Sequence, residues 1–290
     1  MPSIDWNAAI GYARLVQIAE QVDPKAEYSA SDIQKIKNAG YTFLATIYGD
    51  DLATDVNPHP GDVVTFGFLA QSATARELVA VVRGTDGILE WLHDGAFLWV
   101  KCPVNGSRGM TEDGFTSVYL SLRTGRTKGT PTAKSAVKNL LDAGKAANVT
   151  VCGHSLGGAL ATLLSLDVAL NTACRTPMAY TFASPRTGNG TFADFYNTKV
   201  AASFRVVNKL DLVPTLPTRP FYAHVDTEFE LDPPPDTINP SIPCWHHLTT
   251  YLWLMSQQAG SGGLPLDKNC LPPPPPEEDT EEDTPLGGGG

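Results

Sequence analysis

Residues 149–158 limit the possible folds of this chain more than any other stretch. They begin with a β-branched run, which predicts a strand, and they lead directly into small and apolar residues, which predict a helix. Between the two lies the pentapeptide Gly-His-Ser-Leu-Gly, residues 153–157. Its glycines permit a turn so tight that larger side chains there would collide with neighbouring backbone. The stretch therefore predicts a strand, a sharp turn and a helix, with Ser155 at the apex.

Ser155 is a candidate nucleophile, because such a turn presents its hydroxyl in a cleft above the sheet. The backbone N–H of Leu156 would point into the same space, where it could stabilise an oxyanion. A serine hydroxyl is a poor nucleophile near neutral pH. It needs a base within hydrogen-bonding distance and an acid that orients the base. The pattern predicts a serine hydrolase whose other two groups come from elsewhere in the chain.

The composition is that of a globular chain with an acidic tail. The net charge is −10, and the six acidic residues after Leu271 leave −4 for the remainder. A mildly acidic surface argues against nucleic-acid binding. Five prolines, an acidic run and four glycines predict a disordered tail over residues 271–290. Residues 1–270 are expected to form one α/β domain.

The cysteines set limits on cofactors and cross-links. None of the five lies at CxxC spacing, so zinc and thioredoxin patterns have no support. Cys152 falls in the strand before Ser155 and should be a buried free thiol. Disulfide pairing stays open among Cys102, Cys174, Cys244 and Cys270.

Two kinds of membrane-related segment are not expected in this chain. No stretch approaches the roughly 18 uninterrupted apolar residues of a membrane span. The N-terminus lacks a basic region followed by an apolar one, so no secretory signal is predicted here. A secreted mature form and a cytoplasmic protein both remain open.

The alternation of apolar strands and helices predicts an α/β fold with a mostly parallel central sheet flanked by helices. The N-terminal strands are candidates for antiparallel pairing, and Trp99 is expected in the core. The proline-rich stretch 212–244 predicts an ordered loop at the rim of the site. The expected strands cover 41–48, 62–71, 77–83, 96–104, 150–152, 178–183 and 203–208, and the expected helices cover 7–21, 115–123, 132–147 and 246–255.

The acid is expected beyond Ser155, because this fold places its catalytic groups in the chain order Ser, Asp or Glu, His. Asp211 is the best candidate. It follows the apolar strand 203–208, at the carboxyl end where α/β sites are built. The weaker candidates lie in another segment or in the proline-rich loop: Asp194, Asp226, Asp232 and Asp236.

The same order leaves three histidines as candidate bases: His224, His246 and His247. His224 could instead be a structural residue of the rim. His246 and His247 are adjacent at the expected start of a helix, so their side chains would point about 100° apart. Only one of the two could face Ser155, and the spacing does not choose between them.

The chain resembles the class 3 (fungal-type) lipases of the α/β-hydrolase fold over about residues 41–254. The resemblance implies a catalytic triad of Ser155, Asp211 and His246. His247 stays an alternative, because a doubled histidine departs from the simplest family pattern. The blocks that carry the resemblance are Val-Val-Arg-Gly-Thr at 81–85, Trp-Leu-His-Asp at 91–94, Gly-Phe at 114–115, residues 153–158, 180–189 and 205–214, and His-x-Leu-x-Thr-Tyr-Leu beginning at His246.

The resemblance also implies an oxyanion hole and a short helical lid. Thr85 would join Leu156 as a donor, through its backbone N–H and its hydroxyl. Residues 87–94 place three apolar side chains at helical spacing, and the family has a mobile lid at this position. The expected lid and acyl-pocket residues are Ile88, Leu89, Trp91 and Leu92.

The resemblance implies a serine carboxylic ester hydrolase, most directly a triacylglycerol lipase. A feruloyl or short-chain carboxylesterase and a phospholipase A1 are alternatives on the same scaffold, because the fold does not decide the substrate. A non-catalytic lipid-binding relative is the alternative of another class. The implied chemistry uses no metal and no organic cofactor. We expect a monomer that contacts a lipid–water interface transiently and binds a lipid or other ester, but no nucleic acid.

Overall fold

The computed structural model describes residues 3–51, 62–85, 97–225 and 227–272. The expected lid and acyl-pocket residues, Ile88, Leu89, Trp91 and Leu92, lie outside the described residues, and so does nearly all of the expected tail. The division into one domain over 1–270 and a tail over 271–290 stays a prediction.

A seven-stranded sheet forms the centre of the described fold, in the order β1-β2-β3-β6-β7-β8-β9. In this sheet the first three strands pair antiparallel, and the pairs from β3 through β6, β7 and β8 to β9 are parallel. The mostly parallel sheet and the antiparallel N-terminal strands are therefore confirmed. The strands are β1 (Tyr41–Asp50), β2 (Val63–Ser72), β3 (Glu77–Val82), β6 (Asn148–His154), β7 (Met178–Phe182), β8 (Ala202–Asn208) and β9 (Glu228–Leu231).

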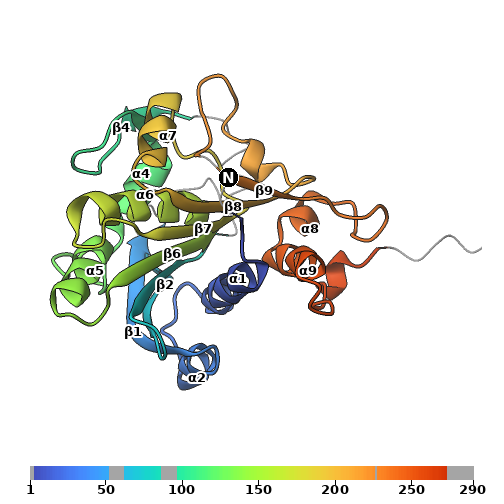
Figure 1. The fold of residues 1–290 in the computed structure, drawn as a ribbon, viewed down its shortest axis with the longest axis horizontal. Coiled ribbons are helices and arrows are strands. Elements are labelled where there is room, and N and C mark those ends of the chain that lie inside the picture. Colours follow the sequence, from blue (N-terminus) through green and yellow to red (C-terminus); the bar gives the residue numbers. More distant parts are fainter. Residues whose placement is uncertain (1–2, 52–61, 86–96, 226, 273–290) are drawn as a thin grey trace, which may run out of the picture.

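Helices cover both faces of this sheet (Figure 1). One face packs against α4 (Asp113–Ser121), α5 (Ala133–Asp142), α6 (Leu156–Asn171) and α7 (Gly190–Asn197). The other packs against α1 (Trp6–Glu20), α2 (Ala30–Asn38) and α9 (Leu248–Gln258). Nearly every residue of α6 is buried, because it lies between the sheet and the outer helices α4 and α5. Within the described ranges, no helix has the length and apolar character of a membrane span.

The expected strand over 96–104 and the expected burial of Trp99 are both wrong. Among the described residues 97–104, only β4 (Trp99–Lys101) forms, and it pairs with β5 (Met110–Glu112) in a separate two-stranded sheet. The Trp99 side chain is 41% exposed and lies edge-on to Phe221 and Tyr222. A two-stranded sheet at the surface leaves one face uncovered, so an apolar run there does not imply a core strand.

The C-terminal region departs from the expected single helix over 246–255. His246 ends α8 (Ile242–His246), His247 is extended with φ −61° and ψ 134°, and α9 begins at Leu248. His247 caps α9, since its Nδ1 accepts the Thr249 N–H at 3.3 Å. The strand β9 within the proline-rich loop was also missed, because four residues between prolines give a weak pattern. Two short 3₁₀ segments complete the described elements, η1 (Val213–Thr215) and η2 (Lys268–Cys270).

One disulfide joins Cys244 of α8 to Cys270 of η2. Cys102, Cys152 and Cys174 are buried free thiols. The expectation of a buried, unpaired Cys152 is therefore confirmed. Because Cys244 lies two residues before His246, the bond fixes α8 near the end of the described chain.

Loss of this disulfide should destabilise the fold. The bond joins residues 26 apart, and a cross-link of that span adds about 3 to 4 kcal/mol to the free energy of unfolding. We expect the double variant Cys244→Ala/Cys270→Ala to lose about that much in equilibrium urea unfolding. Cys174→Ala is the control, since removal of a buried free thiol should cost about 1 kcal/mol. Equal losses in the two proteins would contradict the stabilising role of the cross-link.

Candidate active site

Ser155 occupies a tight turn between β6 and α6, as the glycine pattern predicted. Its φ of 57° and ψ of −128° lie in a region that residues with a side chain rarely adopt. A Cβ on Gly153 would lie 2.1 Å from the Gly157 carbonyl oxygen, and a Cβ on Gly157 would lie 2.3 Å from that of Val82. Both positions therefore require glycine, and their close packing holds the serine at the end of the sheet.

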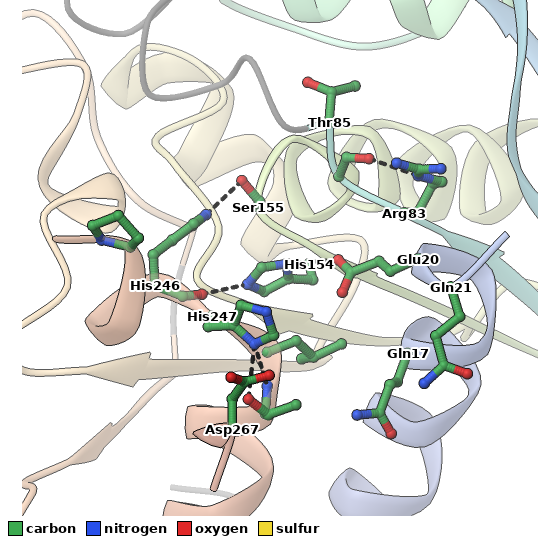
Figure 2. A pocket seen from close by; sticks show the side chains of 14 residues that line it. Gln17, Glu20, Gln21, Arg83, Thr85, His154, Ser155, His246, His247 and Asp267 are labelled. Carbon is green, nitrogen blue, oxygen red and sulfur yellow. Dashed lines mark hydrogen bonds and ion pairs between the residues drawn. The ribbon is translucent and has the colours of Figure 1, made fainter. Parts of the chain in front are cut away.

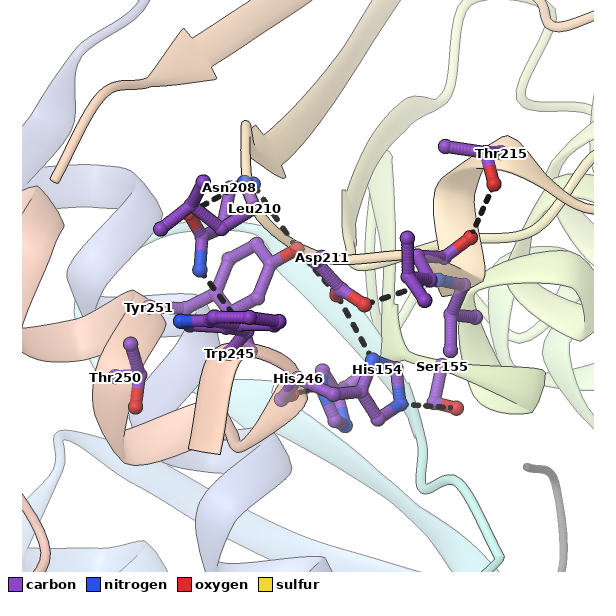
Figure 3. Close-up of polar contacts among 12 residues, drawn as sticks. His154, Ser155, Asn208, Leu210, Asp211, Thr215, Trp245, His246, Thr250 and Tyr251 are labelled. Carbon is purple, nitrogen blue, oxygen red and sulfur yellow. Dashed lines mark hydrogen bonds and ion pairs between the residues drawn. The ribbon is translucent and has the colours of Figure 1, made fainter. Parts of the chain in front are cut away.

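Ser155, His246 and Asp211 form one hydrogen-bonded chain (Figure 3). The Ser155 Oγ lies 2.8 Å from His246 Nε2, and His246 Nδ1 lies 2.8 Å from Asp211 Oδ2. A carboxylate only accepts, so Nδ1 carries the proton and Nε2 is left to accept the serine hydroxyl. All three side chains are buried. The structure thus brings together the three residues that the family resemblance implied.

Three donors hold Asp211 in place. In addition to His246, the Tyr251 hydroxyl donates to Oδ2 at 2.7 Å, and the Val213 backbone N–H donates to Oδ1 at 3.0 Å. Tyr251 comes from α9 and was not singled out from the sequence, although it lies in the last family block. Burial of a carboxylate is costly unless its oxygens are hydrogen-bonded. These contacts compensate for the burial and fix the orientation of the acid.

Asn208, the last residue of β8, connects the strand to the helix that carries His246. Its Nδ2 donates to the Trp245 carbonyl oxygen at 2.8 Å, and its backbone N–H donates to the Tyr251 hydroxyl at 3.0 Å. Asp211 follows three residues later, just beyond the carboxyl end of β8, where the sequence predicted it. The acid and the histidine therefore share one rigid support.

The other candidate histidines make different contacts. His247 is exposed and its ring caps α9 through Thr249. His224 Nε2 donates to the Pro214 carbonyl oxygen at 2.6 Å. Burial and the nearby Arg205 lower the pKa of His224 to about 3, so its ring is neutral. Of the three histidines, only His246 contacts Ser155.

The other candidate acids make different contacts from those of Asp211 with His246. Asp232 pairs with Lys209 at 2.9 Å on the surface. Asp194 is exposed on α7, and Asp236 is exposed in a turn with φ 56°. Asp226 lies outside the described residues.

Burial sets the protonation state of His246. It disfavours the charged ring and lowers the pKa of His246, although Asp211 opposes the shift through its hydrogen bond and its charge. The ring is therefore neutral near pH 7, which leaves Nε2 free to accept a proton.

A cavity of about 470 Å³ opens beside Ser155 (Figure 2). Thr85 lies on its wall, directly after the buried Arg83 and Gly84 at the end of β3. The Arg83 side chain donates to the carbonyl oxygens of Gly84 and Val22, each at 2.9 Å, and so fixes the segment that carries Thr85. The residues around the cavity are Gln17, Glu20, Gln21, Arg83, Gly84, Thr85, His154, Ser155, Pro243, His246, His247, Leu248, Thr249 and Asp267.

The geometry agrees with an oxyanion hole formed by Leu156 and Thr85. Leu156 is the first residue of α6, and the first N–H groups of a helix have no partner within it. Thr85 lines the cavity beside Ser155 and follows β3, which pairs directly with β6. Their assignment as oxyanion donors remains a proposal.

His154 and Glu20 are part of the site, but the sequence did not single them out. The His154 ring lies 2.8 Å from the Glu20 carboxylate and 2.9 Å from the His246 carbonyl oxygen. His154 precedes Ser155 in the chain, so the order Ser, Asp or Glu, His excludes it as the base. Glu20 lies 135 residues before Ser155, and no local pattern connects the two.

Comparisons with known proteins identify the family. The model of the family "Lipase (class 3)" matches residues 79–221. A phospholipase A1-II 3 of Oryza sativa subsp. indica is 32% identical over 218 residues, which cover 67% of this chain and 52% of the relative. A secreted mono- and diacylglycerol lipase 1 of Fusarium solani is 31% identical over 171 residues, or 57% of this chain and 47% of the relative. The chain thus spans about half the length of these relatives.

Solved structures show the same fold. A nonglycosylated LIP2 lipase of Yarrowia lipolytica has a TM-score of 0.63 at 20% identity, over 82% of this chain and 84% of that one. A mono- and diacylglycerol lipase of Aspergillus oryzae has a TM-score of 0.58 at 24% identity, over 81% and 83%. Together with the matched family model, these likenesses confirm the expected fold and family. The chain has the α/β-hydrolase fold and belongs to the class 3 lipase family.

Proposed function

We propose that this protein hydrolyses carboxylic esters of acylglycerols through an acyl-enzyme on Ser155. The observation that carries the proposal is the chain of hydrogen bonds from Asp211 through His246 to Ser155, beside a cavity. In this proposal Ser155 is the nucleophile, His246 the general base and acid, and Asp211 the group that orients His246.

The reaction would begin with attack of the Ser155 oxygen on the ester carbonyl carbon. The hydroxyl proton moves to His246 Nε2, and Asp211 stabilises the resulting imidazolium. The carbonyl oxygen gains the negative charge and accepts hydrogen bonds from Leu156 and Thr85, the proposed donors. His246 then gives its proton to the leaving alcohol oxygen as the carbon–oxygen bond breaks. Water attacks the acyl-enzyme by the same route and releases the fatty acid.

Triacylglycerol lipase is the proposed activity, and phospholipase A1 is the second candidate. The rice relatives bear the name phospholipase A1, and a Fusarium relative bears the name mono- and diacylglycerol lipase. The substrates in these names are all esters of an acylated glycerol, which supports that substrate class. The proposed lid and acyl-pocket residues are Ile88, Leu89, Trp91 and Leu92, which would select among such esters.

We also propose an oxidising, extracellular location and a monomeric protein that contacts a lipid–water interface transiently. The Cys244–Cys270 bond supports the location, because disulfides persist mainly outside the cytosol. The Fusarium relative is named as secreted, which agrees.

Substitution of Ser155 tests the mechanism directly. We expect Ser155→Ala to lower kcat on a p-nitrophenyl ester by about 10⁵- to 10⁶-fold, and an organophosphonate to label the wild-type serine alone. His246→Ala should cause a comparable loss. His247→Ala, its neighbour, should lower stability by about 1 kcal/mol through loss of the α9 cap, with a far smaller loss of kcat. A larger loss at His247 than at His246 would overturn the assignment of the base.

The lowered pKa of His246 predicts the acid limb of the pH profile. The base must be neutral, so kcat/KM falls as pH decreases through this pKa. Because burial lowers it, the limb should have an apparent pKa below the ordinary value of about 6.5. In Asp211→Asn the limb should move lower still, since Asp211 opposes the shift, and kcat should drop by about 10⁴-fold. A wild-type limb above 6.5 would be inconsistent with the buried neutral base.

Substrate profiling tests the proposed ester class. We expect fatty-acid release from a triacylglycerol emulsion, and a p-nitrophenyl ester series whose rates rise when an interface forms, because lipases act on aggregated substrate. The measurement compares that emulsion with diacylphospholipid vesicles and with soluble feruloyl esters, at equal ester concentration. Faster hydrolysis of the vesicles would favour phospholipase A1. Activity confined to soluble esters, with no response to an interface, would refute the lipase proposal.

A further inference from the structure

His154 lies between His246 and the N-terminal helix α1 (Figure 2). Its Nδ1 is 2.8 Å from Glu20 Oε1, and its Nε2 is 2.9 Å from the backbone carbonyl oxygen of His246. The rings of His154 and His246 are tilted by 34°, with centroids 4.8 Å apart. The His154 ring is buried, whereas the Glu20 side chain is 24% exposed and faces the cavity that contains Ser155. The two residues therefore link α1 to the proposed base.

Both partners of His154 are hydrogen-bond acceptors. A backbone carbonyl oxygen can only accept, so Nε2 must carry a proton. An ionised carboxylate can only accept, so Nδ1 must carry one too. His154 is then an imidazolium, and Glu20 is its counterion.

The surrounding charges agree with that protonation state. Burial disfavours the charged ring, but the charge and hydrogen bond of Glu20 outweigh it and raise the pKa of His154. Burial likewise disfavours an ionised Glu20, yet His154, and to a lesser extent Arg83, lower the pKa of its carboxyl. The charge of Asp211 adds a smaller contribution that also raises the pKa of His154.

Glu20 occupies an unfavourable position in its own helix. It is the last residue of α1, where the helix dipole favours a cation over a carboxylate. A carboxylate there weakens the helix end unless a cation outside the helix compensates, and His154 supplies that cation. The placement suggests that Glu20 serves the contact with His154 rather than the stability of α1.

The His246 carbonyl oxygen lies where a helix supplies no backbone donor. His246 is the last residue of α8, and the last carbonyls of a helix have no acceptor role within it. His247 then leaves the helical conformation. His154 therefore supplies a fixed donor at the point where the backbone that carries the proposed base changes direction.

We propose that His154 and Glu20 are positioning residues for His246. His154 holds the His246 backbone through its Nε2–H, and Glu20 fixes the orientation of the His154 ring. The inference rests on the proposed function, in which His246 activates Ser155. Displacement of a reacting group by about 1 Å can cost roughly 100-fold in rate, so the contact acts on kcat through the position of His246.

Two substitutions of His154 by amides of similar size distinguish the hydrogen bond to the His246 carbonyl oxygen from the packing of the ring. The amide nitrogen of Gln can take the place of His Nε2, whereas the shorter Asn side chain reaches only the place of Nδ1. We expect His154→Asn to lower kcat on a soluble p-nitrophenyl ester by about 10- to 100-fold, with KM changed less than about twofold. His154→Gln should recover most of that loss. Equal kcat values in the two variants, or a larger loss in His154→Gln, would overturn the proposal.

Glu20 offers a second test at a partly exposed position, where a substitution is less disruptive to folding. Glu20→Gln keeps a polar partner for Nδ1, and a neutral His154 can still donate its Nε2–H to His246. Glu20→Leu removes that partner. We expect kcat to fall about tenfold or more in Glu20→Leu and much less in Glu20→Gln, with thermal unfolding followed for both. Wild-type kcat in Glu20→Leu would overturn the role of Glu20.

Organophosphonate labelling distinguishes this inference from the proposed function. The labelling rate reports activation of Ser155 without reference to the natural ester. Labelling of the wild type that slows in His154→Asn and Glu20→Leu supports the inference, even if no acylglycerol is hydrolysed. Labelling at the wild-type rate in both variants refutes it. A wild-type protein that resists the reagent would refute the proposed mechanism and with it the inference.

Discussion

The close backbone contact at the glycines around Ser155 is the constraint on which the site depends. A Cβ on Gly157 would lie 2.3 Å from the Val82 carbonyl oxygen, at the end of the adjacent strand β3. A Cβ on Gly84, just beyond that strand, would lie 3.0 Å from the Ser155 Cβ. The start of α6 and the segment that carries Thr85 therefore lie too close together to admit a side chain at Gly157 or to accommodate one at Gly84 without a shift. The proposed nucleophile and oxyanion donors lie at the ends of neighbouring parallel strands, and their separation depends on the absence of side chains at these glycines.

The position of Asp211 depends on the hydrogen bonds that compensate for the burial of its charge. Asp211 is almost fully buried, and a carboxylate in that environment requires several donors. Its donors come from three segments: His246 from α8, Tyr251 from α9 and Val213 from the segment after β8. The same contacts that stabilise the charge therefore hold both C-terminal helices against the end of β8. Stability and geometry are supplied by one set of hydrogen bonds, so a substitution at Tyr251 would affect both.

Contiguous sequence patterns made the turn at Ser155 and the position of the candidate acid Asp211 predictable. Ser155 lies in a contiguous motif, and Asp211 directly follows a strongly apolar strand. The break at His247 was not predictable from periodicity, because a single capping hydrogen bond determines it. The exposure of Trp99 depends on a two-stranded sheet that no apolar pattern distinguishes from a core strand. Glu20 was missed for a third reason: its contact with His154 spans 134 residues, and no local sequence pattern connects the two.

The proposed reaction places a second positive charge, on His246, beside the positive charge of His154. When His246 accepts the serine proton, it becomes a cation whose ring centroid is 4.8 Å from that of the charged His154. Burial lowers the pKa of His246, and that repulsion lowers it further, whereas Asp211 and, to a lesser extent, Glu20 raise it. A carboxylate on each side therefore offsets the repulsion between the two imidazolium rings. Glu20 is the counterion of His154, so the positive charge of His154 opposes formation of the His246 cation less than it would alone. In that arrangement the N-terminal helix is part of the electrostatics of the proposed active site, although it is far from Ser155 in sequence.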